Sequence, residues 1–185
     1  MTDSGQGLVA VCVDERAMTP GVEAAIRELL CACFPDAAWN FAHTRAWHGS
    51  GPEYSIVSCE GDRAFGHVGV VVREIACDGV RTRIAGVQNV AVHPERRRSG
   101  LSRLIMRESM QEAERRGIPF GVLFCVPGLE NFYHSLGWHK VEATVTMLDE
   151  TGADAPTDPK NIMMVKQLGE APFTATAVHL LGADW

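Results

Sequence analysis

The sequence has none of the long apolar runs, leader patterns or paired cysteines that mark membrane, secreted and zinc-binding proteins. No apolar stretch approaches the roughly 20 residues that cross a bilayer, and the longest candidate, 120–126, has the length of a strand. The N-terminus lacks the basic region and apolar core of a signal peptide. The six cysteines form no Cys-x-x-Cys pair and no cluster with zinc spacing. We therefore expect a soluble cytoplasmic protein with free cysteines, no metal site and no membrane contact.

Basic residues are also scarce, with 17 Lys and Arg against 23 Asp and Glu, which gives a net charge of -6. A domain that works on nucleic acid is usually basic, so this composition disfavours nucleic acid as the partner. Apolar residues make up 46% and charged residues 22%, which is typical of globular proteins and excludes wholesale disorder. A chain of 185 residues has the size of one domain, and we expect residues 1–185 to form a single one.

The residue pattern predicts an α+β fold, with a mixed, mostly antiparallel sheet flanked by helices. Thr19-Pro20 opens a helix that has apolar residues on one face, and Phe34-Pro35 ends it. Asp78-Gly79 is a strong hairpin signal between two β-rich runs. The predicted strands span 8–13, 54–58, 64–76, 80–92, 120–126, 138–148 and 162–168, two further helices span 100–116 and 129–136, and loops cover 36–52 and 149–160.

A short basic turn, 96–100, separates the strand 80–92 from the helix that follows. A junction of this kind gathers free backbone N–H groups and the positive end of a helix dipole, which suits a pyrophosphate. Gly100 lets the backbone come close to a ligand, and Ser102 adds a hydroxyl. On charge alone the turn fits a solvated helix start better than an anion site, and its spacing is neither a Walker A loop nor Gly-x-Gly-x-x-Gly.

Two motifs placed around this turn resemble the GNAT N-acetyltransferase superfamily. Arg97-Arg98-Ser99-Gly100-Leu101-Ser102 resembles its motif A, Arg/Gln-x-x-Gly-x-Gly/Ala, and follows the lead-in Val90-Ala91-Val92-His93-Pro94. Asn131 to Trp138 resembles its motif B, with Tyr133 followed by Gly137-Trp138. The resemblance implies the GNAT fold and acetyl-CoA as co-substrate, and the chain looks most similar to the aminoglycoside 2′-N-acetyltransferases and the nodulation acyltransferases.

The resemblance also implies roles for these residues. Tyr133 falls at the position that commonly protonates the departing thiolate of coenzyme A. A phenol suits this role because its ordinary pKa, about 10, exceeds that of a thiol, about 8.5. The residues alone also allow Tyr133 to be a core aromatic that anchors a short helix. The implied coenzyme contacts are the backbone of Val90, Ala91 and Val92 for the pantetheine arm, Arg97, Arg98, Ser99, Gly100, Leu101 and Ser102 for the pyrophosphate, and Asn131.

The general base is the part of the family pattern that this sequence lacks. Gln88 stands where the related aminoglycoside enzymes have a strand glutamate, and an amide cannot take the proton of the attacking amine. The carboxylate of Trp185, together with Asp184, would substitute for it if the tail folds back onto the site. An amine that binds in its neutral form would need no base. The remaining candidates are His43, Glu53, His67 and His93.

These observations favour an enzyme that moves an acetyl group from acetyl-CoA to a primary amine of a small molecule by direct attack in a ternary complex. Aminoglycosides are among the candidate acceptors. Because Gln88 is not a base, a non-catalytic acyl-CoA-binding sensor is the alternative. A nucleic-acid binder that uses Arg96 to Arg98 is disfavoured by the net charge. Cys125 has no evident His partner and is expected in the core. The residues leave open whether the chain forms a homodimer.

Overall fold

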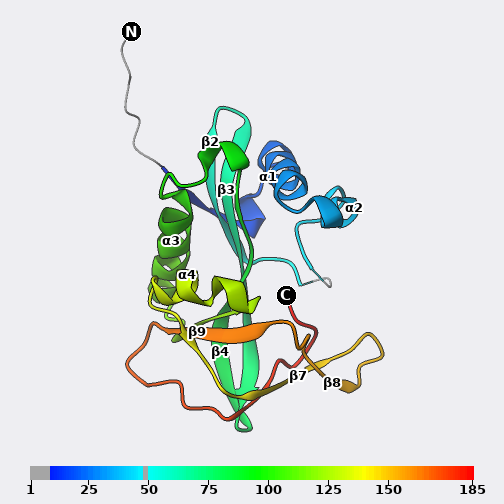
Figure 1. Ribbon diagram of the computed structural model, residues 1–185, viewed down its shortest axis with the longest axis vertical. Helices are drawn as coiled ribbons and strands as arrows, with labels where there is room; N and C mark the ends of the chain where they lie inside the picture. Colours follow the sequence, from blue (N-terminus) through cyan, green and yellow to red (C-terminus); the bar gives the residue numbers. More distant parts are fainter. Residues whose placement is uncertain (1–8, 48–49) are drawn as a thin grey trace.

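The computed structural model describes residues 9–47 and 50–185 as one sheet with helices on both faces (Figure 1). The sheet order is β6-β9-β5-β4-β3-β10-β7-β8, with β2 also beside β3 and β1 beside β2. The helices of four or more residues are α1 Pro20–Cys33, α2 Ala38–Phe41, α3 Leu101–Arg115 and α4 Glu130–His134. The strands are β1 Val11–Asp14, β2 Tyr54–Glu60, β3 Arg63–Cys77, β4 Val80–Val92, β5 Phe120–Cys125, β6 His139–Lys140, β7 Thr144–Leu148, β8 Asp154–Pro156, β9 Ile162–Gln167 and β10 Ala177–His179.

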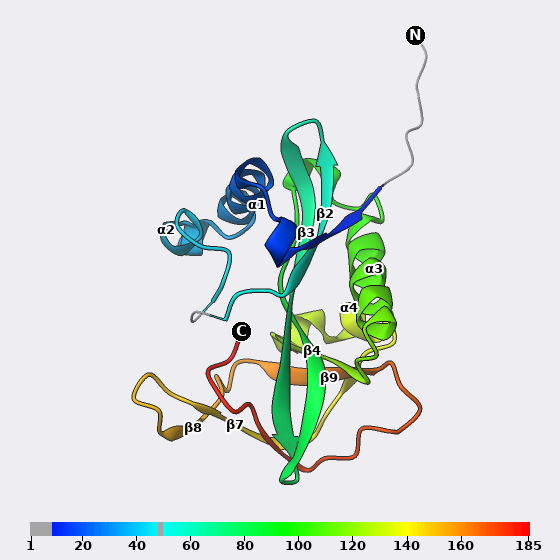
Figure 2. The same ribbon diagram turned by 180° about the vertical axis from the view of Figure 1, so that it is seen from behind.

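The long hairpin of β3 and β4 forms the middle of the sheet, and the other strands lie on its two sides (Figure 2). Its turn is the predicted one, because Asp78 and Gly79 both have positive φ, 47° and 82°, as a tight two-residue hairpin turn requires. Most strand pairs are antiparallel, and the exceptions are β4 with β5 and β10 with β7. The predicted α+β class is confirmed.

The two faces of the sheet are covered differently. The helices α3 and α4 pack on one face, over residues such as Val87 and Leu123. On the other face α1 covers one end through Ile26 and Leu30, and the C-terminal segment covers the opposite end through Trp185. Phe34, which follows α1, and Trp185 of the C-terminal segment both line the cavity described below.

One predicted strand, 138–148, is wrong because the chain changes partners within it. Residues 139 and 140 form β6 and pair with β9, whereas 144–148 form β7 and pair with β10 and β8. The connecting residues leave one edge of the sheet and join the other, so no single strand spans both. Periodicity within one segment carries no information about such a change of neighbour.

Three further differences concern short elements that depend on tertiary contacts. The predicted loop 36–52 contains α2, and the predicted loop 149–160 contains β8. The tail, for which no helix or strand was predicted, adds β10 between β3 and β7. Each element has only three or four residues and is stabilised by its neighbours rather than by its own sequence. The predicted strand 8–13 begins at Leu8, which lies outside the described residues, and is observed as β1.

Candidate active site

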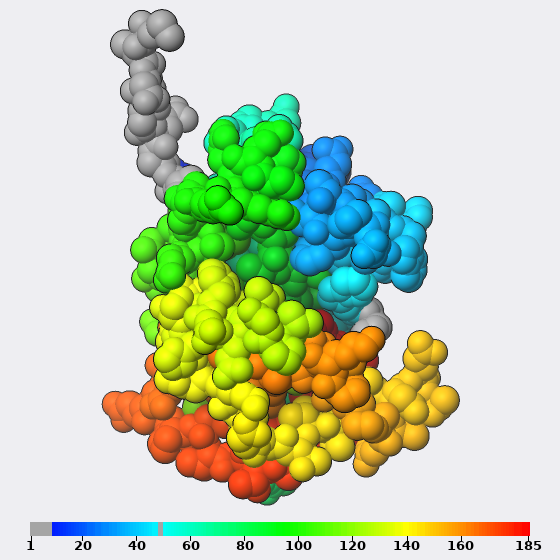
Figure 3. Space-filling view, viewed as in Figure 1, coloured from blue at the N-terminus to red at the C-terminus, as the bar shows by residue number. Residues whose placement is uncertain are grey.

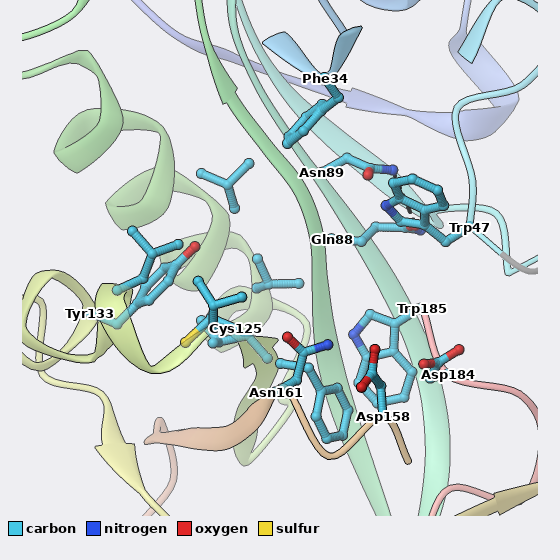
Figure 4. A pocket seen from close by; sticks show the side chains of 16 residues that line it. Phe34, Trp47, Gln88, Asn89, Cys125, Tyr133, Asp158, Asn161, Asp184 and Trp185 are labelled. Carbon is cyan, nitrogen blue, oxygen red and sulfur yellow. Dashed lines mark hydrogen bonds between the residues drawn. The ribbon is translucent and has the colours of Figure 1, made fainter. Parts of the chain in front are cut away.

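The site is built on the place where β4 and β5 separate. The two strands run parallel and pair from Ile84–Phe120 to Val87–Leu123, and beyond that point each continues without the other. A cavity of about 600 Å³ fills the resulting gap. Figure 3 shows the opening as a hollow beside α4, with red atoms of the C-terminal segment inside it. Figure 4 shows the lining side chains, which include Phe34, Trp47, Gln88, Asn89, Cys125, Tyr133, Asp158, Asn161, Asp184 and Trp185.

A β-bulge at Asn89 shapes the β4 side of the gap. The pairing of β4 with β3 shifts register between His67 and Gly69, and Asn89 has a φ of 52°, a left-handed value that asparagine tolerates better than most residues. The bulge brings two successive side chains to the cavity, since Gln88 and Asn89 both line it and contact each other through Asn89 Nδ2 and Gln88 Oε1, 3.3 Å apart. A strand without a bulge would point them to opposite faces.

His67, a candidate base, forms a hydrogen bond with the backbone of this bulge. Its Nδ1 lies 3.0 Å from the backbone oxygen of Asn89, and because a carbonyl only accepts, Nδ1 carries the proton. Its Nε2 then accepts from the Ser55 hydroxyl at 3.2 Å. Complete burial lowers the pKa of His67 to about 4, so the ring is neutral at physiological pH. Its contacts and its place outside the cavity lining give His67 a structural role.

Beyond the bulge, two residues of β4 turn their backbone groups towards the gap. The N–H of His93 donates to the oxygen of Phe65 on β3. Hydrogen-bonded positions alternate along an antiparallel pair, so Ala91 faces its β3 partner, His67, in the same way. Val90 and Val92 alternate with these residues and face the other way, where β5 no longer pairs. The Val92 oxygen accepts from the Cys33 thiol at 3.4 Å, so a linear ligand in the gap would find the backbone groups of Val90 and the N–H of Val92, as a further strand would.

Gln88 occupies the predicted position but is already bonded. Its Nε2 donates to Ser50 O at 2.8 Å, its Oε1 accepts from Asn89, and only 4% of the residue is exposed. These bonds fix the amide against the loop that precedes β2. Of the other candidate bases, His43, Glu53 and His93 are not among the residues that line the cavity.

The basic turn before α3 has the free groups that an anion needs. Arg96 is engaged with Glu60, with contacts down to 2.6 Å, whereas Arg97 and Arg98 form no salt bridge within the described part of the chain. The backbone N–H groups of Arg98, Ser99, Gly100 and Ser102 likewise find no partner among residues 9–47 and 50–185. Gly100 has a φ of 88° and caps α3, so these groups and the helix dipole share one small surface.

Tyr133 projects from α4 into the same cavity from the side of β5 (Figure 4). Its ring is held by Phe132 and Trp138, with centroids 5.0 and 6.3 Å away. Burial raises the pKa of Tyr133 to about 12, and the Cys125 thiol adds to this effect. The phenol is therefore fully protonated at neutral pH. Asn131 of the same helix is exposed and is not among the lining residues.

Cys125 also lines the cavity, and burial raises the pKa of its thiol to about 11, with Glu130 adding to the shift. A thiol that is protonated at neutral pH is a weak nucleophile. This agrees with the expectation that Cys125 is a core residue. Within the described residues, no three His, Cys, Asp or Glu side chains are grouped as metal ligands would be, and no helix is long and apolar enough to cross a membrane.

The C-terminal segment folds back onto the site, as the sequence analysis anticipated for Trp185 and Asp184. The Trp185 indole packs beside Phe124, with centroids 5.5 Å apart, and lies so close to Gly86 that a Cβ there would be 2.5 Å from the ring. Arg73 holds the C-terminal segment in this position by donating to Leu180 O at 2.8 Å and Ala183 O at 2.9 Å. The segment thus supplies one wall of the cavity.

The sequence analysis missed ten of the sixteen lining residues as site residues, among them Asn89 and four from outside β4 and the segment 120–134. Asp158 and Asn161 come from the connection between β8 and β9, and Phe34 and Trp47 come from the ends of the α1–α2 region. These four residues belong to no motif, and they meet only because segments far apart in the sequence line the same cavity. The aromatic content of the loop 36–52 was the one available signal, and it fits Trp47.

Comparisons with known proteins agree with this geometry. A family model described as an acetyltransferase (GNAT) domain matches residues 14–141. Nodulation protein A of Bradyrhizobium sp. (strain ANU 289) is 31% identical over 99 residues, which are 52% of this chain and 47% of that protein, so the match spans about half of each. The structure of the Escherichia coli GNAT family N-acetyltransferase YhbS in complex with CoA gives a TM-score of 0.67 at 17% identity, over 95% of this chain and 91% of that one. An aminoglycoside 6′-N-acetyltransferase complexed with coenzyme A gives 0.58 at 14%, over 88% and 99%. At these identities the structures show a shared fold.

Proposed function

Because the chain belongs to the GNAT family of acetyltransferases, we propose that it transfers the acetyl group of acetyl-CoA to a primary amine of a small molecule by direct attack in a ternary complex. The chain, residues 1–185, would act as one catalytic domain, and aminoglycosides are among its candidate acceptors. The observation that carries the proposal is the gap between β4 and β5, where free backbone groups of one strand meet a cavity that a protonated tyrosine also lines.

In this proposal acetyl-CoA lies in the gap with its pantetheine arm along Val90 and Val92, whose backbone groups are not used by β3. Its pyrophosphate lies at the turn before α3, where Arg97, Arg98 and the N–H groups of Ser99, Gly100 and Ser102 are available. The thioester then lies near the bulge. A backbone N–H that points into the gap there would stabilise the negative charge that develops on the thioester oxygen.

The chemical step needs a neutral amine and a proton for sulfur. The nitrogen lone pair attacks the acetyl carbon, a C–N bond forms and the C–S bond breaks. The thiolate takes the proton of the Tyr133 hydroxyl, and the proton that leaves the nitrogen returns to Tyr133 through water. Gln88 is bonded to Ser50 and Asn89 and takes no part in proton transfer. The amine therefore reacts from the fraction that is neutral in solution or in the cavity.

Turnover is the direct test of this function. The protein is incubated with acetyl-CoA and a panel of amines that contains aminoglycosides, polyamines, amino acids and a lysine peptide, and products are detected by mass spectrometry. We expect one class of amine to gain the mass of an acetyl group, and we expect no acetyl adduct on the protein itself, since Cys125 is protonated. Binding of acetyl-CoA without any product would instead support the sensor alternative.

The pyrophosphate site makes a second prediction. Replacing Arg97 and Arg98 together with alanine should raise the KM for acetyl-CoA by about tenfold or more, because each charge-assisted hydrogen bond to an anion contributes about 1.5–3 kcal/mol. The KM for S-acetylpantetheine, which has no pyrophosphate, should not change. Steady-state kinetics with the two donors measures the difference.

Arg96→Ala is the matched control for this pair, since it removes the same charge from the same turn but from a side chain engaged with Glu60 and stacked on Phe65. Its effect on the KM for acetyl-CoA should be clearly smaller. A loss of activity with both donors in the double variant would contradict the assigned pyrophosphate contact.

A further inference from the structure

Among the described residues that line the cavity, the charged side chains are both acidic. Asp158 and Asp184 are its charged residues, and no Lys, Arg or His is among its described lining residues. Figure 4 shows both carboxylates on the side of Trp185, across the cavity from Tyr133. Fixed charges of one sign in a concave, partly desolvated site attract ligands of the opposite sign.

A second polar feature in the cavity points to a ligand that donates hydrogen bonds. Asn89 is only 7% exposed, and its Nδ2 donates to Arg45 O at 2.7 Å and to Gln88 Oε1, which fixes the orientation of the amide. Its Oδ1 is left without a hydrogen-bond partner in the described structure, although Asn89 lines the cavity. Buried acceptors are almost always satisfied, so this oxygen calls for a donor such as an amine N–H.

Aromatic rings complete the surroundings of these groups. The indole of Trp185 and the ring of Phe124 form one wall, and Trp47 lies across from them (Figure 4). Ring faces attract ammonium groups and tolerate the apolar carbons that connect them. The lining is thus suited to a cation with an apolar skeleton.

The lack of a base at position 88 also favours an acceptor with a second positive charge. An amine reacts only when neutral, and Gln88 cannot deprotonate it. A second positive charge in the same molecule lowers the pKa of the first amine, because two like charges repel. A doubly charged acceptor therefore has a larger neutral fraction at its attacking nitrogen than a simple alkylamine has.

We propose that the acceptor is an amine with a second positive charge, such as a diamine, a polyamine or a sugar with two or more amino groups. The attacking nitrogen lies beside Asn89 and donates to its Oδ1, and the second ammonium binds between Asp158 and Asp184. This inference rests on the proposed acetyl transfer and adds the substrate class to it.

Three amines that share one aminobutyl chain test the second charge. They are 1,4-diaminobutane, pentylamine and 5-aminopentanoate, which end in an ammonium, a methyl and a carboxylate. At saturating acetyl-CoA we expect kcat/KM for the diamine to exceed that for pentylamine by at least about tenfold, with the carboxylate compound lowest. Added salt should reduce the first ratio.

Substitutions test which residues cause the expected preference for the diamine. Asp158 is exposed, so Asp158→Asn should fold normally, and it should lower kcat/KM for the diamine several-fold more than kcat/KM for pentylamine. Asp62→Asn, which removes the same charge from the exposed β2–β3 turn, should leave the ratio as it is. Asn89→Gly keeps the left-handed backbone accessible and should raise the KM of all three amines by a similar factor. Its affinity for coenzyme A and its melting temperature show whether it is folded.

Equal kcat/KM for the three amines, a preference for the carboxylate compound, or an unchanged ratio in Asp158→Asn would overturn the inference. Transfer that is confined to amines without a second positive charge would overturn it too. Absence of transfer to every amine of the panel would contradict the proposed function itself, which separates the two failures.

Discussion

Replacing Tyr133 with phenylalanine is expected to lower kcat for acetyl transfer by about 10²- to 10³-fold and to leave the affinity for acetyl-CoA unchanged. The variant retains the ring that packs against Phe132 and Trp138 and removes only the hydroxyl. Without a proton donor the sulfur must leave as a thiolate. Single-turnover kinetics with a saturating amine measures the chemical step directly.

Tyr54→Phe is the matched control, because Tyr54 is the other tyrosine of the chain and is not among the residues that line the cavity. Its hydroxyl donates to Ser109 O at 2.9 Å, so this variant should lose about 1 kcal/mol of stability and no kcat. A Tyr133→Phe enzyme with unchanged kcat would assign the phenol a packing role instead.

The pH dependence of the wild-type enzyme provides an independent check on Tyr133. Because burial raises its pKa to about 12 from an unfolded value of about 10, Tyr133 is protonated in the folded state throughout the usual range. The rate should rise with pH as the amine becomes neutral and should show no decline up to pH 10. Above that value the unfolded state loses its proton first, so stability falls as the pH approaches 12.

The second large effect is expected at Gly86, where the indole of Trp185 occupies the space of a side chain. An alanine Cβ would lie 2.5, 2.7 and 2.8 Å from three ring atoms, so Gly86→Ala must displace the indole. We expect a loss of about 1–3 kcal/mol in the free energy of unfolding, as overpacking typically causes. We also expect a higher KM for the amine, because the displaced ring is a wall of the cavity. Urea unfolding and steady-state kinetics measure the two effects.

A double-mutant cycle tests the cause of this loss. Trp185→Ala should itself destabilise the protein by about 3 kcal/mol, since the ring is 93% buried against Phe124. In that background Gly86→Ala should cost almost nothing, because the clash has gone. Additive losses would mean that the alanine disturbs the pairing of β4 and β5 rather than the indole.

The cofactor half of the site could be predicted because it is local in sequence. Strand, basic turn and helix follow one another between Val90 and Ser102, and Tyr133 comes soon after the next strand. The bulge was missed, although an asparagine within a β-rich run is a signal for it, since asparagine tolerates positive φ. The family resemblance indicated the returning tail, whereas composition and periodicity did not.

The acceptor half could not be predicted because its residues share no spacing. Asp158 and Asn161 reach the cavity only after β6 and β7 have joined opposite edges of the sheet, a rearrangement that the single predicted strand 138–148 concealed. Their side chains have no characteristic pattern before that change of partner is known. The carboxylate of Trp185 stays a predicted base, whereas the position of its indole is now defined.

The residues that line the cavity come from two stretches of the chain, one inside the family match and one after it. The family match ends at residue 141, and Asp158, Asn161, Asp184 and Trp185 all lie after it. Likeness over 14–141 therefore covers the donor groove and the Asn89 side of the acceptor site, and it carries no information about the two acidic residues proposed to bind the second charge. Substitutions in the last 44 residues can redirect such an enzyme to a new amine while the groove for its common co-substrate stays intact.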